Sequence, residues 1–180
     1  MDILRSRVTA ISSFKNMTKA NEKEKVLQKH LFKNLWLVDA AWERAALGGR
    51  MEEDLRGVSP GLFARDEKGA KIEGRLDIRY ATASGRHVIV ELKRYAVRPD
   101  VTDLAKQGLK YFTALRDLLT QQKRGLEPIE VIFVLGEAPK ASGRGRLSED
   151  DYIEKTLSPC NGRYVLQTSS GAAGRPDFPW

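Results

Sequence analysis

The sequence predicts a mixed α/β domain of the α+β kind, in which helices flank a small central sheet. Apolar residues recur at helical spacing over residues 101–122, and they alternate with polar residues over residues 74–82 and 86–93. Residues 129–135 form a short, almost wholly apolar run rich in β-branched side chains, which is typical of a buried strand. The chain has 180 residues, of which 41% are hydrophobic, enough for one domain with a sizeable core.

The first helix of the core should begin near Asn21. Asn21 and Glu24 have the spacing of a capping box, and leucines follow at helical spacing at positions 27, 31 and 35. Residues 1–20 show no clear period and fit either a lead-in helix or a linker. Residues 48–61 are polar and contain glycine and proline, which predicts a loop.

The sheet should begin with consecutive antiparallel strands, at residues 62–65, 74–82 and 86–93. Ser84 and Gly85 supply the turn between the last two. Because strand residues alternate between two faces, His87 falls in phase with position 91 but at the far end of its strand, and we expect it at the surface or the sheet edge.

A long helix and a central strand should follow the antiparallel strands. Asp100 is the expected N-cap of a helix over residues 101–122, whose apolar stripe comprises Leu104, Gly108, Phe112, Leu115 and Leu119. Residues 129–135 should then form a strand buried on both faces. The last expected elements are a polar helix and a strand, at residues 148–157 and 163–167.

These elements predict one domain over residues 21–168. Residues 1–20 would be its lead-in or linker segment. Residues 169–180 are rich in Ser, Gly and Pro, so that we expect a disordered tail.

Charge and composition limit the classes of partner and metal. The net charge of +7 and the pI near 9.6 favour a polyanionic partner such as nucleic acid. One cysteine and two histidines exclude a Cys/His zinc cluster, which leaves oxygen-ligated cations. Because no apolar run is long enough to span a bilayer, we expect a cytoplasmic protein that does not contact a membrane.

The expected strands bring two carboxylates and a lysine together. The two-residue period places Glu91 and Lys93 on one strand face, opposite the apolar residues at positions 88, 90 and 92. The same alternation lets Asp77, on the preceding strand, project toward that face. Two neighbouring carboxylates can hold Mg²⁺ or Mn²⁺, and a lysine beside them can orient water or stabilise charge on a phosphoryl group.

Residues 74–77 (Gly-Arg-Leu-Asp) followed by residues 90–93 (Val-Glu-Leu-Lys) resemble the signature of the PD-(D/E)XK nuclease superfamily, with Leu in place of the usual proline before the aspartate. The resemblance implies a restriction-endonuclease-like core, a mixed central sheet flanked by helices, with its elements in the order helix, three antiparallel strands, helix, strand. It also implies a nuclease that hydrolyses phosphodiester bonds, in which Asp77 and Glu91 bind Mg²⁺ or Mn²⁺ and Lys93 is the catalytic lysine.

Two further features resemble subgroups of this superfamily. Gln107 and Tyr111 resemble the Gln-x-x-x-Tyr element of RecB-like nucleases, which implies a place for both at the active-site edge near DNA and counts Gln107 with the catalytic set. Glu24 resembles the additional acidic residue of the first helix, which implies a third metal ligand. Residues 24–37 are similar to the start of nuclease domains in Shedu-type anti-phage proteins, which implies defence or repair, within either a homo-oligomer or a larger multidomain assembly.

Lys140, Arg144 and Arg146 occupy a glycine-rich segment whose backbone could approach phosphates closely, and we expect them to contact nucleic acid. Simpler interpretations stay open for every candidate. The Asp and Glu-x-Lys residues would suit a solvated hairpin face, Glu24 a capping position, Gln107 and Tyr111 a polar helix flank, and the basic segment a solvated loop. The rival functions are a non-catalytic nucleic-acid-binding or assembly module on the same fold, and a metal-free protein-interaction domain.

Overall fold

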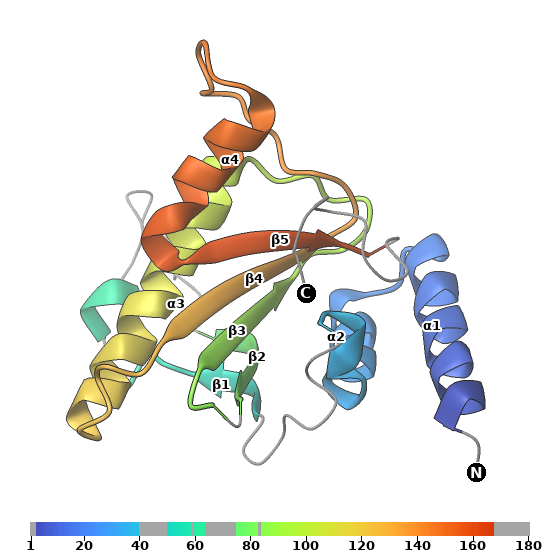
Figure 1. Ribbon diagram of the computed structural model, residues 1–180, viewed down its shortest axis with the longest axis horizontal. Helices are drawn as coiled ribbons and strands as arrows, with labels where there is room; N and C mark the ends of the chain where they lie inside the picture. The colour runs from blue at the N-terminus through green and yellow to red at the C-terminus, as the bar shows by residue number, and fades with distance from the viewer. Residues whose placement is uncertain (1–2, 40–49, 59, 64–74, 83, 168–180) are drawn as a thin grey trace.

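The computed structural model describes residues 3–39, 50–58, 60–63, 75–82 and 84–167. Its centre is a five-stranded sheet in the order β1-β2-β3-β4-β5 (Figure 1). The strands are β1 (Arg50–Asp54), β2 (Arg75–Ala81), β3 (His87–Leu92), β4 (Ile129–Leu135) and β5 (Gly162–Leu166). The first three pair antiparallel, whereas β4 pairs parallel with both β3 and β5. The predicted mixed α/β class is therefore confirmed.

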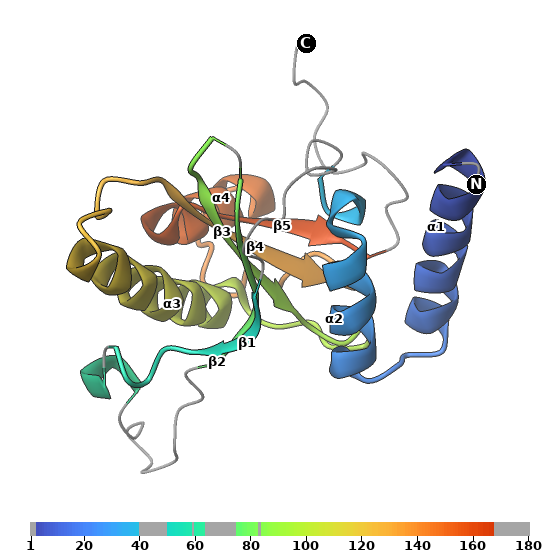
Figure 2. The same cartoon turned by 90° about the horizontal axis from the view of Figure 1, so that it is seen from below.

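Helices cover both faces of this sheet. One face packs against α3 (Val101–Gln121) and α4 (Glu149–Leu157), and the other packs against α2 (Glu24–Lys33). Helix α1 (Ile3–Lys19) lies outside α2, on the side away from the sheet (Figures 1 and 2). No helix in the described residues is both long and apolar enough to cross a membrane.

Strand β4 is buried on both faces, as its composition predicts. Val131 and Phe133 face the α3 side, while Ile132 and Val134 face the α2 side. Full burial of each such side chain contributes about 1.5–3 kcal/mol to the stability of the fold. Because its residues belong to both hydrophobic clusters, this strand lies between them. Its parallel partner β3 is likewise buried along its whole length.

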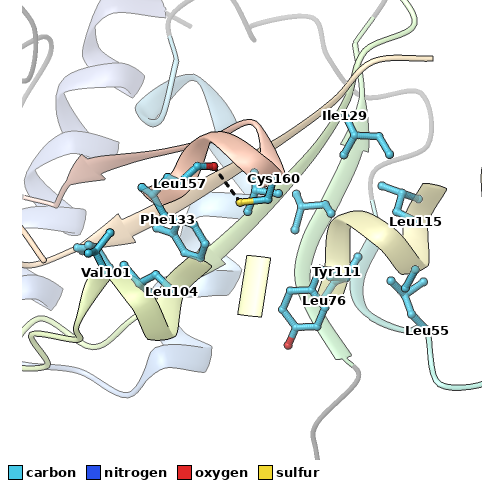
Figure 3. Close-up of a cluster of buried hydrophobic side chains, with 14 of the residues drawn as sticks. Leu55, Leu76, Val101, Leu104, Tyr111, Leu115, Ile129, Phe133, Leu157 and Cys160 are labelled. Carbon is cyan, nitrogen blue, oxygen red and sulfur yellow. Dashed lines mark hydrogen bonds between the residues drawn. The ribbon is translucent and has the colours of Figure 1, made fainter. Parts of the chain in front are cut away.

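Helix α3 begins and packs as its sequence predicts. The Asp100 carboxylate accepts a hydrogen bond from the Thr102 backbone nitrogen at 2.9 Å. A Cβ on Gly108 would come within 2.9 Å of Cys160 Sγ and of Phe133 Cζ, so glycine permits close packing of the helix on β4. The predicted stripe needs one correction, because Tyr111 is 3% exposed and lies in the core (Figure 3). Phe112, which the stripe includes, is only half-buried.

Two predictions for the first half of the sheet are wrong. Residues 50–54, within the predicted loop, form β1, because charged side chains pair across the strands: Arg79 binds Glu53 at 2.8 Å. Residues 62 and 63, predicted as the start of a strand, belong to the 3₁₀ helix η3 (Pro60–Phe63), where Leu62 packs on the core without extended backbone. Residues 64 and 65 lie outside the described residues.

Residues 3–19 form the helix α1, which is one of the two alternatives, a lead-in helix or a linker, that the sequence allowed for this segment. Phe14 of α1 stacks on His30 of α2 with ring centroids 5.9 Å apart, and His30 Nε2 lies 2.9 Å from the Ala10 carbonyl oxygen. The predicted capping box is wrong. Asn21 adopts a positive φ of 48° after α1, which asparagine tolerates, so that Glu24 is the first residue of α2 rather than its third.

His87 was expected at the surface or edge, but its side chain is buried, with 1% of the residue exposed. Parallel pairing with β4 covers it, and its Nε2 lies 2.6 Å from Glu127 Oε2. The predicted C-terminal elements are confirmed: Ser148 caps α4, and β5 follows a short 3₁₀ turn, η4 (Ser158–Cys160). The predicted tail, residues 169–180, lies outside the described residues, and the domain limits stay predictions.

Candidate active site

Glu91 forms the floor of a cavity beside the end of β3. Only 4% of the residue is exposed, because the sheet and α3 enclose it. Its Oε1 accepts hydrogen bonds from the Lys93 ammonium, at 3.2 Å, and from the Gln107 side-chain amide. Its Oε2 is buried and has no hydrogen-bond partner among the described residues. A buried carboxylate oxygen without a donor leaves room for a cation or a proton.

Asp77 lies on the neighbouring strand. Ile78 pairs with Val90, so the next position along each strand brings Asp77 beside Glu91. Asp77 Oδ2 accepts a hydrogen bond from the Leu92 backbone nitrogen at 2.8 Å, which fixes the carboxylate against β3. The sequence prediction that Asp77, Glu91 and Lys93 share one site agrees with their placement.

The electrostatics of the cavity floor favour a bound positive charge. Burial raises the pKa of Glu91 above its ordinary value, and repulsion from the Asp77 carboxylate raises that pKa further. The Lys93 ammonium opposes these effects and lowers the pKa of Glu91. Two carboxylates in one poorly hydrated place repel each other, and a divalent cation between them would relieve that repulsion.

The cavity has a volume of about 330 Å³ and is lined by acidic and basic side chains in equal number. The acidic ones are Glu24, Asp77, Glu91 and Asp103, and the basic ones are Arg75, Lys93, Lys106 and Lys110; Gln107 and Tyr111 complete the lining. Glu24 therefore opens onto the same cavity as the candidate ligands. Within the described residues, however, no three or more His, Cys, Asp or Glu side chains are close enough together to hold a metal ion.

Gln107 and Tyr111 occupy the positions on α3 that face the candidate site. The Gln107 amide reaches Glu91, and it also lies 3.3 Å from the Tyr111 hydroxyl. The Tyr111 hydroxyl donates to the Arg75 carbonyl oxygen at 3.1 Å, so it ties α3 to the start of β2. The expected nucleic-acid contact of both residues stays a prediction.

Two of the three basic residues of the 140–146 segment line a second cavity, of about 550 Å³, at the start of α3. Lys140 and Arg144 line it together with Arg98, whereas Arg146 is exposed outside it. Backbone pairing of Lys140 with Asp100 attaches this segment to the helix start. Arg144 is paired with Glu149 at 3.2 Å, in an exposed ion pair of small energetic value.

Sequence reasoning missed two buried glutamines that support the site. Gln28 of α2 donates its amide to the Asp77 carbonyl oxygen, and Gln167 after β5 donates to the Lys93 carbonyl oxygen, each at 2.5 Å. Both residues are 3% exposed. Gln28 directly follows a buried leucine of the apolar stripe of α2, and a polar residue at such a position is the signal that could have identified it.

A scan of protein-family models, a search of curated proteins and a search of solved structures each found no match to this chain. Any functional interpretation therefore depends on the residues themselves. The strongest feature is the convergence of Asp77, Lys93 and Gln107, which are half-buried, around the buried Glu91 in one cavity.

Proposed function

We propose that this chain is a metal-dependent nuclease of the PD-(D/E)XK class, with a restriction-endonuclease-like core. The order of elements supports the proposal: helix α2, three antiparallel strands, helix α3 and the parallel strand β4 follow one another as the resemblance implies. The candidate residues come from β2, the end of β3 and the facing side of α3. The expected substrate is DNA.

One observation carries the proposal more than any other. Glu91 is a nearly buried carboxylate with a second carboxylate beside it, and one of its oxygens lacks a partner among the described residues. A group this unfavourable is rare unless a ligand or a reaction uses it. A solvated hairpin face, the simpler interpretation, would leave Glu91 hydrated.

The donor set fits Mg²⁺ or Mn²⁺. These ions accept hard oxygen ligands, and Mg²⁺ in particular is often held by one or two carboxylates, several waters and a substrate phosphate rather than by a complete protein cage. Asp77 and Glu91 would hold the ion, and Glu24, which lines the same cavity, would act through water. When bound, the ion supplies positive charge to a phosphoryl oxygen and acidifies a water molecule.

The side chains of the chain itself would position the reactants. Glu91 would orient the attacking water, while Gln107 holds the Glu91 carboxylate in place. The Lys93 ammonium, 3.2 Å from Glu91 Oε1, would stabilise negative charge that develops on the phosphoryl oxygens. In this hydrolysis the water oxygen would bond to phosphorus, the bond from phosphorus to the leaving oxygen would break, the water proton would pass to the carboxylate or solvent, and the leaving oxygen would take a proton from solvent.

A second candidate function is a non-catalytic nucleic-acid-binding module on the same fold. A specific observation favours it: the described residues contain no three-ligand metal group. The ion pair of Glu91 with Lys93 also satisfies both side chains in part without a metal. In that case the basic side chains that line the cavity would bind nucleic acid, and Asp77 and Glu91 would catalyse no reaction.

A cleavage assay separates these functions. The protein is incubated with linear duplex, circular duplex and single-stranded DNA, in Mg²⁺, Mn²⁺ or excess chelator. Cleavage in metal but not in chelator, lost in Lys93→Ala, is the expected result. Binding of all three DNAs without cleavage under any condition would replace the nuclease with the non-catalytic module.

A further inference from the structure

The smaller cavity lies along helix α3, and the larger one lies beside the start of that helix. The Asp100 carboxylate accepts a hydrogen bond from the Ser142 backbone nitrogen, which places the larger cavity at the helix start. Asp103, Gln107 and Lys110 line the smaller cavity. Residues 100, 103, 107 and 110 follow helical spacing and so share one side of α3.

Lysines flank the smaller cavity on this side of the helix. Lys106 and Lys110 are four residues apart, which separates their positions by about 6 Å along the helix axis. In the part of the chain that the structure describes, neither makes an ion pair with an acidic side chain. Two adjacent ammonium groups that form no ion pair with the described residues, beside a candidate phosphodiester site, are suited to a ligand with regularly spaced negative charges.

The larger cavity, which shares no lining residue with the smaller one, provides further basic side chains at the start of α3. Arg98 and Lys140 line it, and the backbone bridge between Asp100 and Lys140 holds that loop at the helix start. The distance along α3 from residue 100 to residue 110 is about 15 Å, which corresponds to about four nucleotides of one duplex strand. The basic side chains therefore cover more than a single phosphate.

We propose that a nucleic-acid strand lies along α3, with its phosphates on Lys110 and Lys106 next to the candidate active site and on Arg98 and Lys140 beyond the helix start. This inference rests on the proposed function for its scissile position, but its binding component does not require cleavage. It assigns Lys106, Lys110 and Arg98 to the nucleic-acid surface, in addition to the 140–146 segment.

Asp103 gives the proposal a test of opposite sign. It is exposed, lines the smaller cavity and lies one turn from Gln107, so its negative charge would face the proposed nucleic-acid strand. A polyanion that follows α3 is repelled by Asp103. Neutralising it by Asp103→Asn should therefore tighten binding, a gain that partial unfolding cannot produce.

The experiment measures binding of a fluorescent 20-nucleotide DNA, single-stranded and duplex, by anisotropy in chelator over a range of salt concentrations. Lys106→Ala/Lys110→Ala should reduce the slope of log affinity against log salt by about 1.8 on duplex, and affinity at 0.1 M salt by roughly 10- to 60-fold. The matched control is Lys29→Ala/Lys33→Ala on α2. These lysines are exposed, have the same spacing and line neither cavity.

Melting curves in the same buffer verify that all variants are folded. Equal slopes for the α3 pair and the α2 control, unchanged affinity of Asp103→Asn, or no DNA binding by the parent would each overturn the proposed path. Cleavage by the parent in Mg²⁺ is measured separately. If the parent cleaves DNA and the α3 variant binds DNA as the parent does, the proposed path is refuted and the nuclease proposal stands. If the α3 variant binds DNA more weakly but the parent never cleaves it, the path stands and the nuclease proposal is refuted.

Discussion

In the absence of metal, the Glu91 carboxylate should destabilise the folded protein. The residue is 4% exposed, its Oε2 has no partner among the described residues, and Asp77 repels it. Glu91→Gln keeps the shape, removes the charge and keeps an oxygen for Lys93 and Gln107. Because the neutral amide ends the repulsion from Asp77 and places a nitrogen donor where Oε2 was an unpartnered acceptor, the variant should unfold with a free energy higher by about 1–3 kcal/mol in chelator.

Thermal melting measures this effect. For a domain of this size, 1 kcal/mol corresponds to about 2–4 °C, so the variant should melt roughly 2–12 °C above the parent. Mn²⁺ should reverse the order, since the parent gains about 4.1 kcal/mol at a thousand times its dissociation constant and the variant gains little. Glu22→Gln, at an exposed position, is the control and should stay within about 0.5 kcal/mol in either buffer.

The sign of the pH dependence follows from the raised pKa. A folded carboxyl with a raised pKa stabilises the fold when protonated, and this contribution is lost as pH rises through the folded pKa. The advantage of Glu91→Gln over the parent should therefore grow as pH rises above the ordinary carboxyl value of 4.5. A variant less stable than the parent in chelator at high pH would refute the reasoning and identify Glu91 as a satisfied ion-pair partner.

Three further predictions concern residues within or directly after strands of the sheet. Lys93→Ala should abolish metal-dependent cleavage and leave DNA binding nearly unchanged, but it should lower the melting temperature in chelator, because the buried Glu91 carboxylate loses its counter-charge. Cleavage at the parental rate would contradict the catalytic role of Lys93. Gln167→Met should lower turnover at least tenfold with little change in KM, because the Lys93 carbonyl oxygen loses the donor that positions this residue. Melting should change little, because the substitution also removes the unpartnered buried Gln167 oxygen. Parallel losses of turnover and stability would indicate a purely structural role. Burial lowers the pKa of His87, so the free energy of unfolding, measured by urea denaturation, should fall as pH decreases below the ordinary histidine value of 6.5. This fall should be absent in His87→Gln. It should also be separate from the titration of Glu127, whose pKa the Arg124 guanidinium lowers to about 2.

The sequence by itself determined the elements whose signal is local. Helix α3, with Asp100 as its cap, and the apolar strand β4 both follow from the period and type of their residues. Residues 77, 91 and 93 could be placed at one site because strand alternation is a property of the backbone, independent of the rest of the fold.

Only the tertiary structure decided the features that depend on contacts between distant segments. Strand β1 carries little apolar signal and is held by pairing with β2 and by the Glu53–Arg79 ion pair, so composition predicted a loop. His87 and Tyr111 are buried because β4 and the core cover them, which their own sequence neighbours do not reveal. Gln28 and Gln167 support Asp77 and Lys93 across 49 and 74 residues of chain, and no local pattern encodes hydrogen bonds at that separation.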